Sequence, residues 1–206
     1  MKAYGGVPLS QQADSPPNLW GQFGEPRYHE EMIRIFLIGY MCSGKTTLGR
    51  AFALKMGLQF IDMDWYIEGR FHKTVKQIFA ELGEEAFREM ERKMLHEVGD
   101  FENVMISCGG GTACFFDNVQ YMNQQGQTVY MKASIDTLFS RLQIGKAKRP
   151  LLMNMTDEEM RQYITEQLAY REQFYSQATY VFDSNRLESR HQIDKSIEEL
   201  RLLLGL

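Results

Sequence analysis

The sequence predicts an α/β protein in which a five-stranded, parallel sheet is covered by helices on both faces. Short runs of β-branched and aromatic residues alternate along the chain with longer segments whose apolar residues recur at helical spacing. A glycine-rich loop also joins the first of these strands to the first helix. We therefore expect a three-layer α/β/α sandwich.

Five segments are predicted strands because each is a short apolar run bounded by glycine or polar residues. The first of them is a β-rich, largely apolar run that ends at Gly39, which is typical of a buried strand. In chain order they are 33–38, 59–61, 103–107, 127–131 and 180–182.

The segments between the strands carry helix signals. Gly57 is a C-cap, Ser134 is an N-cap, and 156–159 matches a capping box. Gly83 divides a long charged segment into two helices. The predicted helices are 46–56, 74–98 with this break, one that begins at Ser134, one from 156 to about 176, and 189–204.

The first 31 residues differ from the rest of the chain. They are rich in glycine and proline and show little periodicity. We interpret 1–31 as a disordered leader or a tag, with Met32 as a natural initiator just before the first strand. Residues 32–206 are expected to form a single domain, which is long enough to bury a large core.

Charge and composition exclude some partners. The net charge is −4, whereas a nucleic-acid-binding protein generally presents a basic face. No apolar run approaches the ~20 residues that a membrane span needs, and the chain does not begin with a secretory signal pattern. The three cysteines lack metal-site or CxxC spacing, as expected for thiols in a reducing cytoplasm.

Residues 39–46, GYMCSGKT, match the motif GxxxxGK[ST] and define the phosphate loop. Its glycines let backbone N–H groups and a helix N-terminus surround an anion, Lys45 reaches the β- and γ-phosphates, and the Thr46 hydroxyl binds Mg²⁺. Cys42 stands where many small kinases carry another glycine. The residues predicted to bind ATP here are Cys42, Ser43, Gly44, Lys45, Thr46 and Thr47.

Asp62 and Asp64 follow the second predicted strand, at the end where parallel sheets hold ligands. Strand alternation predicts that their carboxylates point the same way. One can support Mg²⁺, while the other binds a substrate hydroxyl and acts as a base. The alternative is a pair of solvated acids in a turn.

Two further features point to a bound acceptor. Arg88 lies on a helix with Glu91 three residues later, a spacing that can hold its guanidinium as a clamp for a carboxylate, although a solvated arginine is the alternative. Three glycines, Gly109, Gly110 and Gly111, directly follow a strand. Because such a run is a costly way to make an ordinary turn, we interpret this glycine triplet as a close approach of backbone to ligand.

A basic, aperiodic segment at about 143–157 is predicted to be a lid. Arginines delivered by mobile loops stabilise the negative charge of phosphoryl transfer, and Arg149 is the candidate. An exposed basic loop is the alternative. Arg171 lies on the next helix, and Arg186 follows the last strand, where it is a candidate for contacting adenine.

The order of these motifs resembles the shikimate kinase family. GxxxxGKT is followed by DxD, FRxxE, GGG, RPLL and a further arginine, across essentially all of 32–206. The family has a P-loop NTPase fold like that of nucleoside-monophosphate kinases, with a lid. The resemblance implies phosphorylation of the shikimate 3-hydroxyl by MgATP, in aromatic amino acid biosynthesis, by a cytoplasmic monomer.

The resemblance also implies roles for single residues. Lys45, Asp64 and Arg149 would be catalytic, and Thr46 and Asp62 would hold Mg²⁺. The remaining substrate contacts would come from Arg88, Gly109, Gly110, Gly111 and Arg171. A related kinase, such as gluconate kinase, and a nucleotide-binding relative without turnover are the alternatives.

Overall fold

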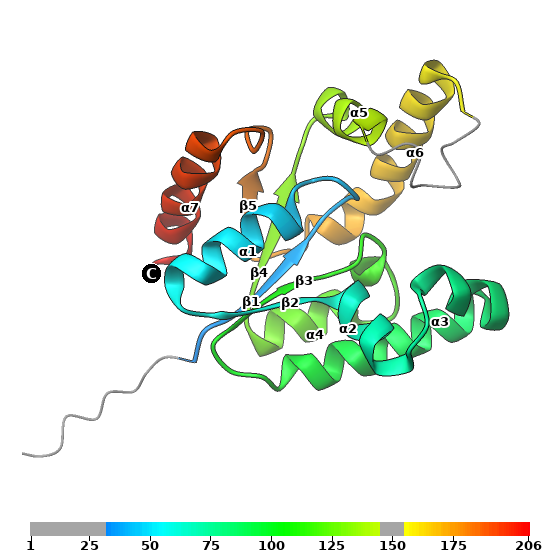
Figure 1. Cartoon of the computed structure of the whole chain (residues 1–206), viewed down its shortest axis with the longest axis horizontal. Helices are drawn as coiled ribbons and strands as arrows, with labels where there is room; N and C mark the ends of the chain where they lie inside the picture. Colours follow the sequence, from blue (N-terminus) through cyan, green and yellow to red (C-terminus); the bar gives the residue numbers. More distant parts are fainter. Residues whose placement is uncertain (1–31, 145–154) are drawn as a thin grey trace, which may run out of the picture. The chain divides into compact units, whose positions relative to one another are not determined.

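The computed structural model describes residues 32–144 and 155–206, and these contain one parallel sheet of five strands (Figure 1). The strand order is β2-β3-β1-β4-β5, and every pair is parallel. The predicted fold class is confirmed. The strands are β1 (Arg34–Ile38), β2 (Gln59–Asp62), β3 (Val104–Ser107), β4 (Gln127–Lys132) and β5 (Tyr180–Asp183).

The helices that were predicted are confirmed, and the described residues contain three additional helical segments. The break at Gly83 is real, since this residue has φ 81° and ψ 175° inside α3. The predicted segments are α1 (Lys45–Met56), α3 (Val75–Gly99), α5 (Ile135–Ile144), α6 (Asp157–Tyr175) and α7 (Arg190–Leu204). The additional ones are α2 (Met63–Phe71), the 3₁₀ helix η2 (Thr112–Cys114) and α4 (Asn118–Gln125).

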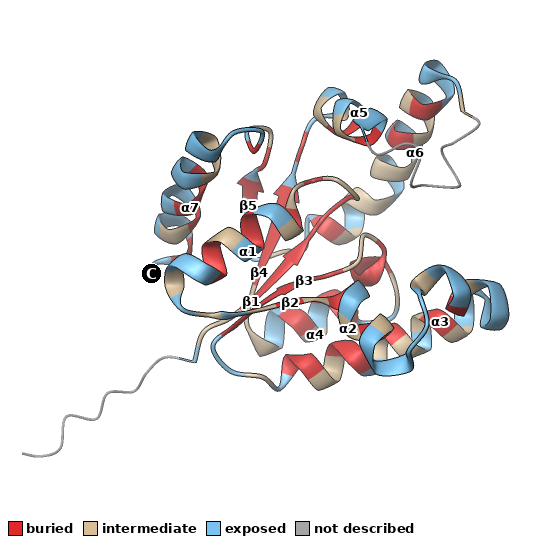
Figure 2. Ribbon diagram, in the orientation of Figure 1, coloured by how far each residue is buried: buried red, intermediate tan, exposed pale blue. Residues whose placement is uncertain are grey.

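The buried residues form two cores, one on each face of the sheet (Figure 2). Successive residues of β1 alternate between them: Leu37 packs with α1 and α7, and Phe36 packs with α3, α4 and α6. This alternation follows from the twofold period of a strand, and it explains why β1 is apolar from Ile35 to Ile38. The three-layer arrangement places the loops that follow the strands at one edge of the sheet.

The sheet topology fixes where a ligand can bind. β1 is central, and the chain leaves it first toward β2 and later toward β4 on the other side. A sheet of this kind has a crevice at the carboxyl ends of its strands where the direction changes. The phosphate loop follows β1 at this point, α2 follows β2, and the glycine triplet follows β3.

Two predictions fall partly or wholly on residues that the structure does not describe. The predicted leader, 1–31, lies outside the described residues. So does 145–154, which includes Arg149 and most of the predicted lid. Among the helices in 32–144 and 155–206, none is long and apolar enough to cross a membrane.

Candidate active site

The phosphate loop depends on two glycines. Gly39 has φ 139° and Gly44 has φ 99°, both in the region that side chains rarely adopt. A Cβ on Gly39 would lie 2.8 Å from the carbonyl oxygen of Met131, and one on Gly44 would lie 2.3 Å from Leu187 Cδ1. Backbone conformation and lack of space therefore both require glycine here.

Cys42 also has a positive φ, of 61°. A side chain costs roughly 1–2 kcal/mol in the left-handed region, so this residue stores strain that a glycine would not. Its carbonyl oxygen accepts a hydrogen bond of 3.3 Å from Arg141 Nη1 on α5. The loop is thus tied to a helix that lies far along the chain.

Lys45 and Thr46 point into the site from the first turn of α1. The buried Lys45 ammonium donates to the carbonyl oxygens of Gly39 and Tyr40, both at 2.9 Å, and burial lowers its pKa. Thr46 Oγ1 donates to Asp62 Oδ2 at 2.8 Å. A hydroxyl and a carboxylate side by side suit Mg²⁺, which takes few protein ligands and completes its shell with phosphate oxygens and water.

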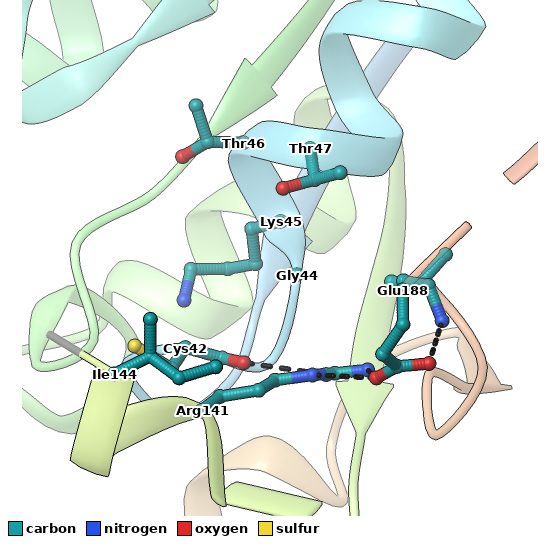
Figure 3. A pocket seen from close by; sticks show the side chains of 9 residues that line it. Cys42, Gly44, Lys45, Thr46, Thr47, Arg141, Ile144 and Glu188 are labelled. Atoms are coloured by element: carbon teal, nitrogen blue, oxygen red, sulfur yellow. Dashed lines mark hydrogen bonds and ion pairs between the residues drawn. The ribbon is translucent and has the colours of Figure 1, made fainter. Parts of the chain in front are cut away.

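A cavity of about 500 Å³ adjoins the phosphate loop (Figure 3). Arg141 extends along its wall, where it donates to the Cys42 carbonyl and forms an ion pair of 2.6 Å with Glu188. Thr47 also lines this cavity, whereas Arg186 lines a separate one with His191. Sequence reasoning singled out Arg186 and missed Arg141, which is the arginine beside the loop.

Asp64 is in the first turn of α2 and not on a strand, so the predicted reason for its orientation was wrong. Asp62 is the N-cap of this helix, and its Oδ1 accepts a hydrogen bond from the Asp64 backbone N–H at 3.2 Å. Surrounding protein atoms remove water from around the Asp64 carboxyl and so raise its pKa, and the negative charges of Asp62 and Glu91 raise it further. Lys45 opposes this rise, and the resulting pKa is about 6. Such a carboxyl group can accept a proton near neutral pH.

Arg88 is held from several sides, as its spacing from Glu91 predicted. Nη1 donates to Glu91 Oε2 at 2.8 Å, and Nη2 donates to Glu84 Oε1 at 3.2 Å. The guanidinium lies 4.2 Å from the ring centroid of Phe115. Arg88 Nε is buried, and no hydrogen-bond partner for it occurs within 32–144 or 155–206. A fixed guanidinium with a donor to spare is suited to a ligand carboxylate.

Arg171, from α6, reaches the same place. Its Nη1 donates to the carbonyl oxygen of Gly110 at 3.2 Å, and its guanidinium lies 5.3 Å from the ring centroid of Tyr40 in the phosphate loop. Burial raises the pKa of the Cys114 thiol to about 11, and the positive charges of Arg171 and Arg88 oppose this rise. Arg88 and Arg171, the arginine clamp, lie against the adjacent residues Gly111 and Gly110.

The glycine triplet leaves room for these side chains. None of its three residues has a positive φ. A Cβ on Gly111 would lie 2.7 Å from Arg88 Nη2, one on Gly110 would lie 3.5 Å from Arg171 Nη1, and one on Gly109 would lie 3.2 Å from Asp64 Oδ1. A Cβ would therefore crowd side chains of the protein at Gly109 and Gly111, whereas at Gly110 it would make only ordinary contact. The close approach of a ligand to this turn stays a prediction.

A family model described as shikimate kinase matches residues 41–201. The chain belongs to the shikimate kinase family. A curated shikimate kinase of Phocaeicola vulgatus is 57% identical over 174 residues, which cover 84% of this chain and 99% of that protein.

Solved structures of this family have the same fold. The crystal structure of shikimate kinase from Bacteroides thetaiotaomicron is 54% identical, covers 85% of this chain and 99% of its own, and superposes with a TM-score of 0.83. A shikimate kinase from Acinetobacter baumannii, solved in complex with shikimate, is 30% identical, covers 85% and 95%, and has a TM-score of 0.74. Shikimate kinases are ATP-dependent, and the oxygen groups of Thr46 and Asp62 fit the Mg²⁺ that such enzymes use.

Proposed function

We propose that this chain transfers the γ-phosphoryl group of ATP to the 3-hydroxyl of shikimate, and that the residues brought together at the carboxyl edge of the sheet perform the reaction. The observation that carries the proposal is the convergence of the arginine clamp on the glycine triplet, beside Asp64. A nucleotide site alone occurs in many classes of protein, so it is this acceptor site that selects the reaction.

Shikimate matches the acceptor site group for group, because it carries one carboxylate and several hydroxyls on a small ring. Arg88 and Arg171 bind the carboxylate as charge-assisted donors. Asp64 accepts hydrogen bonds from ring hydroxyls. Gly109, Gly110 and Gly111 contribute backbone contacts to the ring, and their lack of a Cβ leaves room for the Asp64 and Arg88 side chains beside it.

Asp64 acts as the general base. It takes the proton of the 3-hydroxyl as that oxygen forms its bond to the γ-phosphorus and the bond to the departing ADP breaks. Lys45 stabilises the negative charge that develops on the phosphate oxygens, and we assign Arg149 the same role. Thr46 and Asp62 would hold Mg²⁺, which would supply further charge neutralisation when bound.

The nucleotide binds along the phosphate loop, with Cys42, Ser43, Gly44, Lys45, Thr46 and Thr47 around its phosphates. Arg141 is placed beside the phosphate-loop cavity and so joins Arg186 as a candidate for contacting the base or ribose. Arg141→Ala and Arg186→Ala separate the two: the variant with the larger rise in the KM for ATP identifies the contact.

The decisive experiment is ADP release at saturating MgATP, measured with shikimate, with gluconate and with neither. We expect release that depends on shikimate alone. Release with gluconate alone would instead favour gluconate kinase activity, which was the nearest alternative. ATP binding without either turnover or shikimate binding, measured by titration calorimetry, would point to the non-catalytic relative.

The family resemblance also supports a cytoplasmic monomer that serves aromatic amino acid biosynthesis and binds neither nucleic acid nor membrane. The net charge of −4 is consistent with a small anionic substrate bound by a few placed arginines rather than by a broad basic face. Light scattering after size exclusion tests the monomer: the expected mass is 24.0 kDa.

A further inference from the structure

Thr112 directly follows the glycine triplet, and its hydrogen bonds connect the triplet to α3. The residue is completely buried. Its Oγ1 donates to Glu91 Oε1 at 2.6 Å, and its backbone N–H donates to the Gly109 carbonyl oxygen at 3.2 Å. One residue therefore bonds the turn through its backbone and the arginine-bearing helix through its side chain.

Glu91 needs this hydroxyl. Its side chain is almost completely buried, and its other oxygen, Oε2, accepts from Arg88 Nη1 at 2.8 Å. A buried carboxylate is costly unless its oxygens receive hydrogen bonds. With Thr112 on one oxygen and Arg88 on the other, the carboxylate cannot rotate without losing a bond, and so the guanidinium is held as well.

Thr112 is itself fixed from behind. Its carbonyl oxygen accepts a hydrogen bond of 2.8 Å from Nδ2 of Asn118, a fully buried residue at the start of α4. Thr112 begins η2, whose short backbone is thereby anchored between the sheet and α4. The hydroxyl consequently has a set position relative to the turn, and Glu91 takes its orientation from that position.

We propose that Thr112 is a positioning residue for the acceptor: its hydroxyl holds Glu91, and Glu91 holds Arg88 in the orientation that receives the substrate carboxylate. The proposal rests on the function proposed above, in which Arg88 binds shikimate. Thr112 touches neither substrate in this role. Its hydrogen bonds connect the glycine triplet to Glu91, and through Glu91 to Arg88.

The test is the isosteric variant Thr112→Val, which removes the hydroxyl and keeps the volume. Because a hydrogen bond to a buried charge is lost, we expect the KM for shikimate to rise about tenfold. The KM for ATP should stay within about twofold, since no phosphate-loop residue is involved, and kcat should fall less than about threefold. Thr112→Ser, which restores the donor, should return the KM for shikimate to within about twofold of the wild type.

Thr128→Val is the matched control. Thr128 is also completely buried, and its hydroxyl also donates a hydrogen bond, to Asn123 Oδ1, while it lies 3.2 Å from the Thr179 hydroxyl. It is near the start of β4, away from the carboxyl ends of the strands. The same atom is removed, so general destabilisation appears in both variants. Only Thr112→Val should change the KM for shikimate.

A double-mutant cycle with Glu91→Gln tests whether Thr112 acts on Arg88 through Glu91. If Thr112 acts through Glu91, removing its hydroxyl in the Glu91→Gln background should raise the KM for shikimate much less than tenfold, because the two changes interrupt one path. Full additivity would overturn the proposal. If Thr112→Val does not fold, Thr112→Ala, which removes the same hydroxyl without overpacking, replaces it with the same expected outcomes.

The outcomes separate the two levels of inference. A wild-type enzyme without shikimate-dependent ADP release overturns the proposed function and, with it, the role of Thr112. An active wild type whose Thr112→Val variant keeps its KM for shikimate, or changes it no more than Thr128→Val does, overturns the role of Thr112 alone.

Discussion

The two halves of the active site are built in different ways. The nucleotide half is one continuous loop, 39–46, in which glycine conformations and a buried lysine shape the site. The acceptor half collects side chains from α2, α3 and α6 around the glycine triplet, and partly buried hydrogen bonds hold the two arginines there. Both halves have glycines with little room for a Cβ, Gly39 in the phosphate loop and Gly111 in the triplet, but they differ in what a Cβ would meet: a backbone carbonyl in the first and a guanidinium in the second.

Asp64→Asn should have the largest effect on activity of the changes considered. This effect should be limited to the acceptor half of the site. Loss of the general base is expected to lower kcat by about 10³-fold while ATP affinity by calorimetry stays unchanged. Asp194→Asn, an exposed residue on α7, is the control and should behave as the wild type. A nearly normal kcat in Asp64→Asn would remove this residue from the mechanism.

Arg88→Ala and Arg171→Ala should each weaken shikimate binding by roughly 10- to 100-fold, because each removes charge-assisted hydrogen bonds to the carboxylate. Titration of both variants with ATP should give the wild-type affinity. Arg92→Ala, also on α3 but paired with the exposed Asp117, is the control. An equal loss of ATP affinity in both clamp variants would contradict the division into halves.

The pH dependence of the reaction should also arise in the acceptor half, from Asp64. Because the pKa of Asp64 is raised to about 6, kcat/KM for shikimate should fall about tenfold per pH unit below that value as the base is protonated. For stability the sign is opposite: the raised pKa favours the folded state below the ordinary pKa of an aspartate, and this contribution is lost as the pH rises through 6. Asp64 is solvent-exposed, so only a small rise in the melting temperature of Asp64→Asn is expected above pH 6. A flat rate profile down to pH 5 would contradict Asp64 as the base.

Adding one methyl group to a glycine in each half is a further test of the comparison. Gly111→Ala places a Cβ against the Arg88 guanidinium and should raise the KM for shikimate about fivefold, a cost of about 1 kcal/mol. Gly39→Ala, whose Cβ meets the Met131 carbonyl at a positive φ, should instead raise the KM for ATP. Gly69→Ala, with open space around its Cβ, should change neither. Identical effects of the first two changes would argue against separate halves.

Cys42→Gly should have the smallest effect and should not reduce activity. Relief of the positive φ is expected to stabilise the protein by up to about 1 kcal/mol, or roughly 2–4 °C in melting temperature. Differential scanning calorimetry measures the shift. A lower melting temperature would show that the thiol makes contacts worth more than the strain.

Much of this architecture could be read from the sequence, because the strands are short, largely apolar runs and the phosphate loop is contiguous. The helix α2 was missed because Trp65 and Phe71 are exposed apolar residues that obscure its buried pair, Met63 and Ile67. Its absence from the prediction also misplaced Asp64. The role of Arg141 could not be read either, since its carbonyl partner lies 99 residues earlier in the chain.

The position of β1 has a consequence for how the domain folds. This strand is the first of the five to be synthesised, yet it occupies the centre of the sheet and pairs with β3 and β4. Gly39 lies close to the carbonyl of Met131 in β4, so the phosphate loop reaches its final packing only when that later strand is in place. Pairing over such sequence distances is slow. A nucleotide should therefore bind only after the sheet has assembled, and its stabilising effect should accrue to the complete domain rather than to an early intermediate.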